Sequence, residues 1–185
     1  MPRLKPAPVD DPARLTPDQR RVYDAMMQGP RGRVMGPFPY LLRSPELCDA
    51  IQRIGAFVRF DSKLSGRLGE LTIIITARYW DCHYEWSVHA PLARKEGVPD
   101  AVIDTIRAGK RPSADADAAL IHDITHMLYD NHAIDEATYA KGIAKFGEEG
   151  MLELVVMIGY YALLAQVFAA FEVLPAAGAE RLPAA

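Results

Sequence analysis

The chain has few of the features that mark a disulfide scaffold, a nucleic-acid binder or an exported protein. Only two of its 185 residues are cysteine, Cys48 and Cys82, and we expect both to be reduced thiols. Lys and Arg number 21 against 24 Asp and Glu, and this net charge of −3 gives no electrostatic reason to bind nucleic acid or an anionic membrane. The N-terminal stretch MPRLKPAPVDDPARL lacks the apolar core of a secretion signal. We therefore expect a cytoplasmic protein with a small-molecule partner, and neither nucleic acid nor membrane.

Segments that could pair as β-strands are also scarce. The β-branched run LTIIIT at residues 71–76 favours a strand by local propensity. No second strand-like segment is there to pair with it, however, and a lone strand leaves its backbone groups unsatisfied. We predict a buried helix at this position and an all-α fold, for which the apolar half of the composition supplies one core.

A long uncharged run near the C-terminus raises the question of a membrane span. Residues 154–171 hold no charged side chain. Tyr160, Tyr161 and Gln166 lie inside the run, acidic residues flank it, and no cluster of Lys or Arg anchors either end. We expect a helix buried in the core or in a subunit interface.

Capping residues, glycines and prolines divide the chain into helices. Thr16 and Asp135 predict helix starts, as do Ser44, Ser65 and Ser113. The expected helices cover residues 17–28, 45–60, 70–97, 99–108, 114–130, 136–147 and 154–171. We divide the chain into an N-terminal arm and helix (1–35), one helical domain (36–175) and a flexible tail (176–185).

The stretch WDCHYEWSVH, residues 80–89, concentrates groups able to do chemistry. On one unbroken helix, Arg78, Cys82, Glu85 and His89 would share a face, because their spacing is i, i+4, i+7 and i+11. Glu70 would lie two to three turns earlier, against an apolar run where a carboxylate seldom occurs without a partner. The alternative is a solvated stripe of ion pairs, with the aromatic side chains of the stretch packed in the core.

The other histidines form a weaker pattern. His122 and His126 are four residues apart on a predicted helix, and His132 follows. Two histidines at this spacing can share a metal, but the sequence H-D-I-T-H lacks the glutamate of the metalloprotease motif. We expect no metal site here and interpret the pair as solvated or as part of an interface. His83 is interpreted as incidental.

The motif around residue 85 resembles that of a known family. Glu70, Cys82, the triplet Tyr84-Glu85-Trp86 and His89 resemble the carboxymuconolactone decarboxylase family, which also contains the alkylhydroperoxidase D-like (AhpD-like) proteins. The likeness extends to residues 36–38, 44–47 and 97–99, and residues 146–147 and 159–161 resemble the longer members. It implies a helical, AhpD-like bundle without a cofactor, assembled as a homo-oligomer (dimer, trimer or hexamer).

The resemblance also implies roles for the site residues. The redox branch uses a Cys-x-x-Cys pair, and here Glu85 replaces the second cysteine, so the decarboxylase branch is the better match. It implies loss of CO₂ from a carboxylated unsaturated lactone or a related carbonyl acid, with His89, Glu85 and Glu70 as acid–base residues. We expect the substrate to be bound by Arg78, Tyr84, Trp86 and Cys82. The alternatives are a thiol-dependent hydroperoxide reductase that uses Cys82, and a non-catalytic oligomeric binding protein.

Overall fold

The fold is all-α, as predicted. The computed structural model describes residues 2–183, and none of these residues is in a strand. The α-helices are α1 (Pro17–Gln28), α2 (Phe38–Leu41), α3 (Pro45–Ala56), α4 (Arg67–Tyr79), α5 (His83–Lys95), α6 (Asp100–Arg107), α7 (Ala116–His126) and α8 (Glu136–Ala170). A 3₁₀ turn, η1 (Pro12–Arg14), precedes them, and two π-helical turns, η2 (Phe57–Asp61) and η3 (Met127–Asn131), continue α3 and α7.

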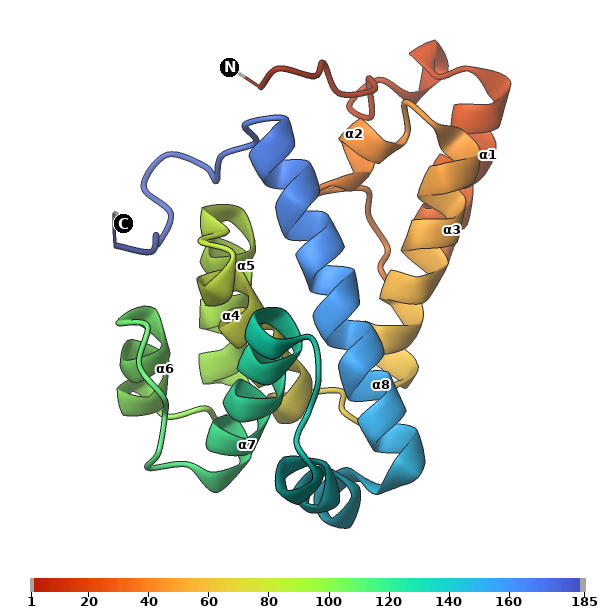
Figure 1. Cartoon of the computed structure of the whole chain (residues 1–185). Helices are drawn as coiled ribbons and strands as arrows, with labels where there is room; N and C mark the ends of the chain where they lie inside the picture. Colours follow the sequence, from red (N-terminus) through yellow and green to blue (C-terminus); the bar gives the residue numbers. More distant parts are fainter. Residues whose placement is uncertain (1, 184–185) are drawn as a thin grey trace.

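Helix α8 runs through the middle of the molecule, with α1 to α3 on one side and α4 to α7 on the other (Figure 1). Helix α4 packs against α5, α7 and α8, and these four helices enclose most of the core. Residues 69–77 of α4 are all buried. The β-branched run therefore forms a helix, as predicted, because it is covered on every side and its backbone bonds stay within the segment.

Two of the predicted helix starts follow the expected chemistry. The Thr16 side chain accepts a hydrogen bond from the Gln19 backbone, and the Gln19 side chain accepts one from the Thr16 backbone, which completes a capping box. Asp135 caps α8 through the Thr138 backbone N–H. The caps predicted at Ser65 and Ser113 are wrong, since α4 starts after Gly66 and α7 is capped by Asp115.

The predicted single helix from Glu70 to Gly97 is also wrong. It breaks at residues 80–82, and α4 and α5 turn back on one another. Asp81 takes a left-handed conformation, with φ of 47°. The Cys82 N–H donates to the Ala77 carbonyl and the Asp81 N–H to the Arg78 carbonyl, which is the Schellman pattern of helix termination. Asp81 here takes the place that glycine more often holds.

Helix α8 contains the uncharged run. Gly147, at φ 72°, divides the helix where we predicted one helix to end and the next to follow. By length and composition alone α8 could cross a membrane, but 61% of its most apolar 18-residue window is buried inside the fold. Its exposed side carries Leu152, Val156 and Leu163. The assembly into a homo-oligomer stays a prediction, and this apolar side is a surface that assembly could cover.

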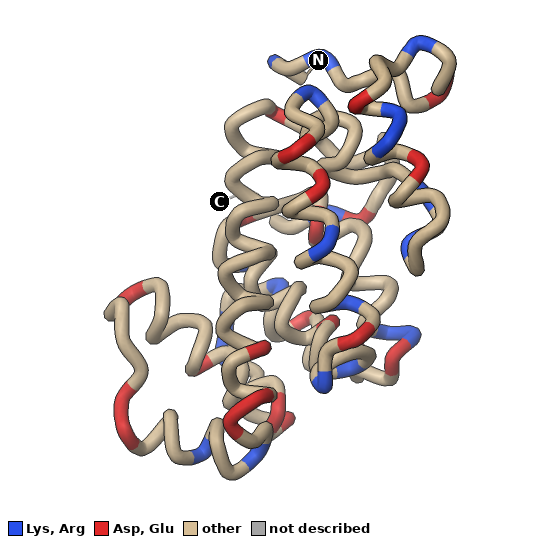
Figure 2. Tube along the Cα trace, turned by 90° about the vertical axis from the view of Figure 1, so that its right-hand side faces the viewer, with Lys and Arg blue, Asp and Glu red and all other residues tan. Residues whose placement is uncertain are grey.

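Charged residues are spread over the molecule, with Lys and Arg interspersed among Asp and Glu along the trace (Figure 2).

The segment that we predicted as a flexible tail lies against the domain as far as it is described. Glu180 contacts α5 and α6 through Arg94 and Arg107, and Leu182 is buried.

Gly55 on α3 is required by close packing. A Cβ atom at this position would lie 2.0 Å from the Tyr160 hydroxyl oxygen and 3.1 Å from Arg31 Nη2. We expect Gly55→Ala to lower the free energy of unfolding by about 1–3 kcal/mol, since the rigid Tyr160 ring must shift. Urea denaturation would measure this. Gly159→Ala on α8 is the matched control, because open space surrounds that position. Equal stability of the two variants would contradict the packing argument.

Candidate active site

The two glutamates of the predicted motif lie against the His89 ring. Its Nδ1 lies 2.7 Å from Glu70 Oε2, and its Nε2 lies 3.2 Å from Glu85 Oε2. Glu85 and His89 are one turn apart on α5, while Glu70 comes from α4. The reversal at residues 80–82 brings the two helices together. Each ring nitrogen of the imidazole thus has a carboxylate partner.

All three side chains are buried. The exposed fractions are 3% for His89, 5% for Glu85 and 8% for Glu70. Burial alone lowers the pKa of His89, but the contacts with Glu70 and Glu85 outweigh burial and hold that pKa above its ordinary value. The arrangement favours an imidazolium held between two carboxylates, which can give up or take a proton near neutral pH.

A cavity of about 200 Å³ opens beside this group. His89 and Glu85 line it, whereas Glu70 does not, so Glu70 reaches the cavity only through the imidazole. Tyr84, which we predicted as substrate-binding, also lines the cavity and stacks on Phe168 with ring centroids 4.3 Å apart. The predicted cluster of Glu70, Glu85, His89 and Tyr84 is therefore brought together; its catalytic role stays a prediction.

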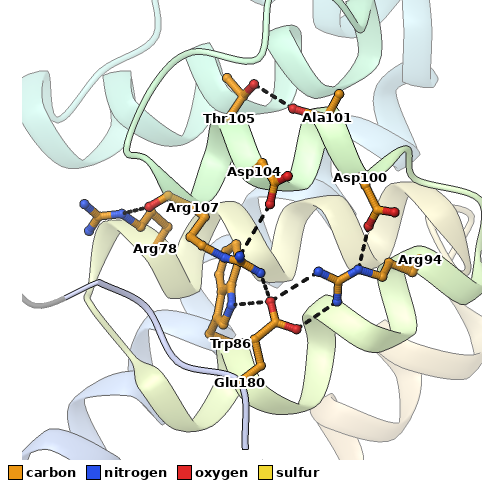
Figure 3. Close-up of polar contacts among 9 residues, drawn as sticks. All are labelled: Arg78, Trp86, Arg94, Asp100, Ala101, Asp104, Thr105, Arg107 and Glu180. Atoms are coloured by element: carbon orange, nitrogen blue, oxygen red, sulfur yellow. Dashed lines mark hydrogen bonds and ion pairs between the residues drawn. The ribbon is translucent and has the colours of Figure 1, made fainter.

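Arg78 is not part of this cluster. It lies near the end of α4, where it forms an ion pair with Asp81 and its Nε donates to the Arg107 carbonyl, 3.0 Å away (Figure 3). It lines a different cavity, together with His122 and His126. Our prediction that Arg78 shares one helix face with Glu85 and His89 is wrong, because the break at residues 80–82 separates α4 from α5.

Cys82 and Trp86, both predicted to bind substrate, point elsewhere as well. Cys82 precedes α5 and lines a separate apolar cavity with Trp80 and Phe168. The Trp86 ring is fully buried, and its Nε1 donates to Glu180 of the C-terminal segment, 3.3 Å away (Figure 3). Neither side chain lines the cavity beside His89.

Five further polar residues, to which we had assigned no role, line the cavity: Arg31, Arg33, Arg59, Tyr160 and Tyr161. The two tyrosines lie inside the apolar run of α8, and the rings of Tyr161 and His89 pack nearly perpendicular to each other with centroids 5.5 Å apart. A pair of tyrosines within a buried helix was a usable signal, since each phenol needs a polar environment. Arg31 and Arg59 reach the cavity through tertiary folding, which no local pattern reveals.

Two of the remaining histidines form a separate stack. The His122 and His126 rings are 4.0 Å apart and nearly parallel. Among residues 2–183, no group of three or more His, Cys, Asp or Glu side chains is arranged to hold a metal ion.

Comparison with models of known families confirms the family resemblance that we found in the sequence. The model of the carboxymuconolactone decarboxylase family matches residues 45–122, which hold Glu70, Glu85 and His89. This segment is a carboxymuconolactone decarboxylase family domain. The match lies inside the range 36–175 that we predicted for the domain, whose outer limits stay a prediction. No curated protein matches the sequence.

Solved structures extend the fold of this family domain to nearly the whole chain. An uncharacterized peroxidase-related protein from Silicibacter sp. TM1040 superposes with a TM-score of 0.72 at 16% identity, over 92% of this chain and 90% of that one. An alkylhydroperoxidase AhpD core, an uncharacterized peroxidase-related protein from Ralstonia eutropha JMP134, gives 0.70 at 19% identity, over 95% and 93%. The AhpD-like helical fold is thereby confirmed.

Proposed function

We propose that this protein is a cofactor-free decarboxylase that acts on a carboxylated unsaturated lactone or a related carbonyl acid. The observation that carries the proposal is the Glu70–His89–Glu85 group, whose His89 and Glu85 side chains line a cavity of about 200 Å³. Decarboxylation consumes one proton, which must be delivered to carbon. An imidazole held between two carboxylates can supply that proton.

The reaction divides among the cavity residues as follows. The bond between the substrate carbon and its carboxylate breaks, CO₂ leaves, and the electron pair moves into the conjugated carbonyl. Burial raises the pKa of Tyr161, which keeps its phenol protonated and able to donate a hydrogen bond to the developing oxyanion. His89 then delivers its proton to carbon. Glu85 holds Nε2 at the cavity, and Glu70 fixes the ring from behind.

Thiol chemistry has less support. Burial, followed by the charge of Glu85, raises the pKa of Cys82 to about 12, and burial raises that of Cys48 to about 12 as well. Such thiols stay protonated, and the thiolate is the form that attacks a peroxide. Cys82 also lies outside the cavity that contains His89.

Cys82→Ser is therefore expected to retain most of the decarboxylase activity. Serine keeps the size of the side chain and is a favoured residue at a helix N-terminus, which is the position of Cys82 at α5. CO₂ release by wild type and variant would measure the effect, and titration of free thiols after treatment with a hydroperoxide would be the parallel assay. Loss of CO₂ release in the variant, together with peroxide-dependent loss of thiols in the wild type, would favour the hydroperoxide reductase instead.

The substrate class can be tested with a thermal-shift screen against unsaturated lactones that carry a carboxylate and against keto acids. Compounds that raise the melting temperature are then assayed for CO₂ release. Ligands that bind without any turnover would favour the non-catalytic binding protein and reject the proposed reaction.

A further inference from the structure

One wall of the cavity comes from a segment outside the matched family domain. The loop between α1 and α2, which precedes residues 45–122, contributes Pro30, Arg31, Arg33, Met35, Gly36 and Pro37 to the lining. The family match thus includes the acid–base residues but not this wall. Differences in ligand preference within the fold can arise here, because loops on a rigid scaffold carry much of its specificity.

Arg31 is the unusual residue of this loop. Its guanidinium stacks over Phe38 at 4.5 Å from the ring centroid. Its Nε and Nη2 are shielded from solvent and have no hydrogen-bond partner. Within residues 2–183, no carboxylate forms an ion pair with it. Burial lowers the pKa of Arg31, which means that the protein environment disfavours its charge. Folded proteins seldom leave shielded polar nitrogens such as these two without a hydrogen-bond partner.

A second guanidinium increases the excess of positive charge. Arg59, from η2, also lines the cavity, and its charge acts against that of Arg31. The nearest carboxylate to Arg59 is Glu70, with Nη2 3.8 Å from Oε1, and Glu70 is already bound more closely by His89. The exposed Arg33 of the same loop is a third cation at this cavity. Like charges at one cavity repel each other, and an anion placed at that wall would be attracted by all three.

We propose that Arg31, supported by Arg59, is the specificity residue that selects small organic anions for this cavity, by forming charge-assisted hydrogen bonds with a ligand carboxylate. The inference rests on the proposed function only in taking this cavity as the active site. The Nη1 nitrogen is the donor on the open side, since Nε and Nη2 are the two that are shielded. This role replaces the one that we predicted for Arg78.

The test compares an anion with its neutral analogue. Benzoate and benzamide have the same ring and nearly the same size, and neither can be turned over. Calorimetric titration of the wild type is expected to show benzoate binding at least about 10-fold more tightly than benzamide, the range expected for a charged hydrogen bond. Arg31→Met keeps an apolar stem against Phe38 without the charge and is expected to abolish the preference. Arg31→Lys keeps the charge without the planar fork and is expected to retain part of it.

Arg43→Gln is the matched control. It removes the same charge from an exposed side chain that does not line the cavity, and it is expected to keep the full preference. Loss of preference in this control would mean that overall charge, not Arg31, selects the anion, and would overturn the proposal. Equal binding of benzoate and benzamide by the wild type would overturn it too, even if Arg31→Met did not fold. Neither result bears on CO₂ release, so the proposed reaction stands or falls separately.

Discussion

Replacement of His89 by glutamine is expected to lower kcat/KM for decarboxylation by about 100- to 10,000-fold, the usual contribution of a positioned acid–base group. A glutamine amide can still donate a hydrogen bond to Glu70, so the position keeps a polar partner and the core keeps its shape. It cannot transfer a proton at neutral pH. The rate of CO₂ release measures the loss, and incorporation of solvent deuterium into the product reports whether the protonation of carbon is the step affected.

A matched control separates this effect from a general disturbance of α5. His83 is the first residue of the same helix and lines the apolar cavity with Cys82, not the cavity beside His89. His83→Gln makes the same chemical change and is expected to leave kcat/KM near the wild-type value. If His89→Gln folded normally and kept full activity, His89 would have no part in proton transfer and the proposed mechanism would fail.

The helices could be predicted largely from local signals. Thr16 and Asp135 carry capping side chains that act within three residues, and a single sequence is enough to find them. The end of α4 at Tyr79 could not be predicted in this way. Its stop signal is a left-handed Asp81, a residue that is tolerated in this conformation but does not demand it.

The turn at residues 80–82 explains which site residues could be predicted from the sequence and which could not. Glu85 and His89 lie on the same helix after the turn, so their i, i+4 spacing predicted a contact that the structure contains. Arg78 lies before the turn, and the same reasoning placed it wrongly. Arg31 is farther still in the chain, inside the range 1–35 that we had set apart from the domain. It reaches the cavity only because the tertiary fold places the α1–α2 loop and α8 around the same space.

The stability of the protein is expected to fall as the pH rises above the ordinary histidine pKa of about 6.5, because the unfolded chain then releases a proton that His89 keeps in the folded protein. The pKa of His89 in the folded protein is raised, since its contacts with Glu70 and Glu85 outweigh the opposing effect of burial. The folded state therefore binds a proton more tightly than the unfolded state. Its contribution is fully present below the ordinary histidine pKa and is lost as the pH rises through the raised value. One proton can change the free energy of unfolding by at most about 1.4 kcal/mol per pH unit.

Urea denaturation of wild type and His89→Gln at several pH values isolates this contribution. His122 acts in the opposite direction, because burial and the neighbouring His126 lower its pKa, but it is present in both proteins and cancels in the difference. The buried thiols Cys48 and Cys82 have raised pKa values and affect stability only at higher pH. The advantage of wild type over variant should shrink with rising pH. A difference that stays constant above the ordinary histidine pKa would mean that folding does not raise the pKa of His89, and would contradict the imidazolium between Glu70 and Glu85 on which the proposed proton transfer rests.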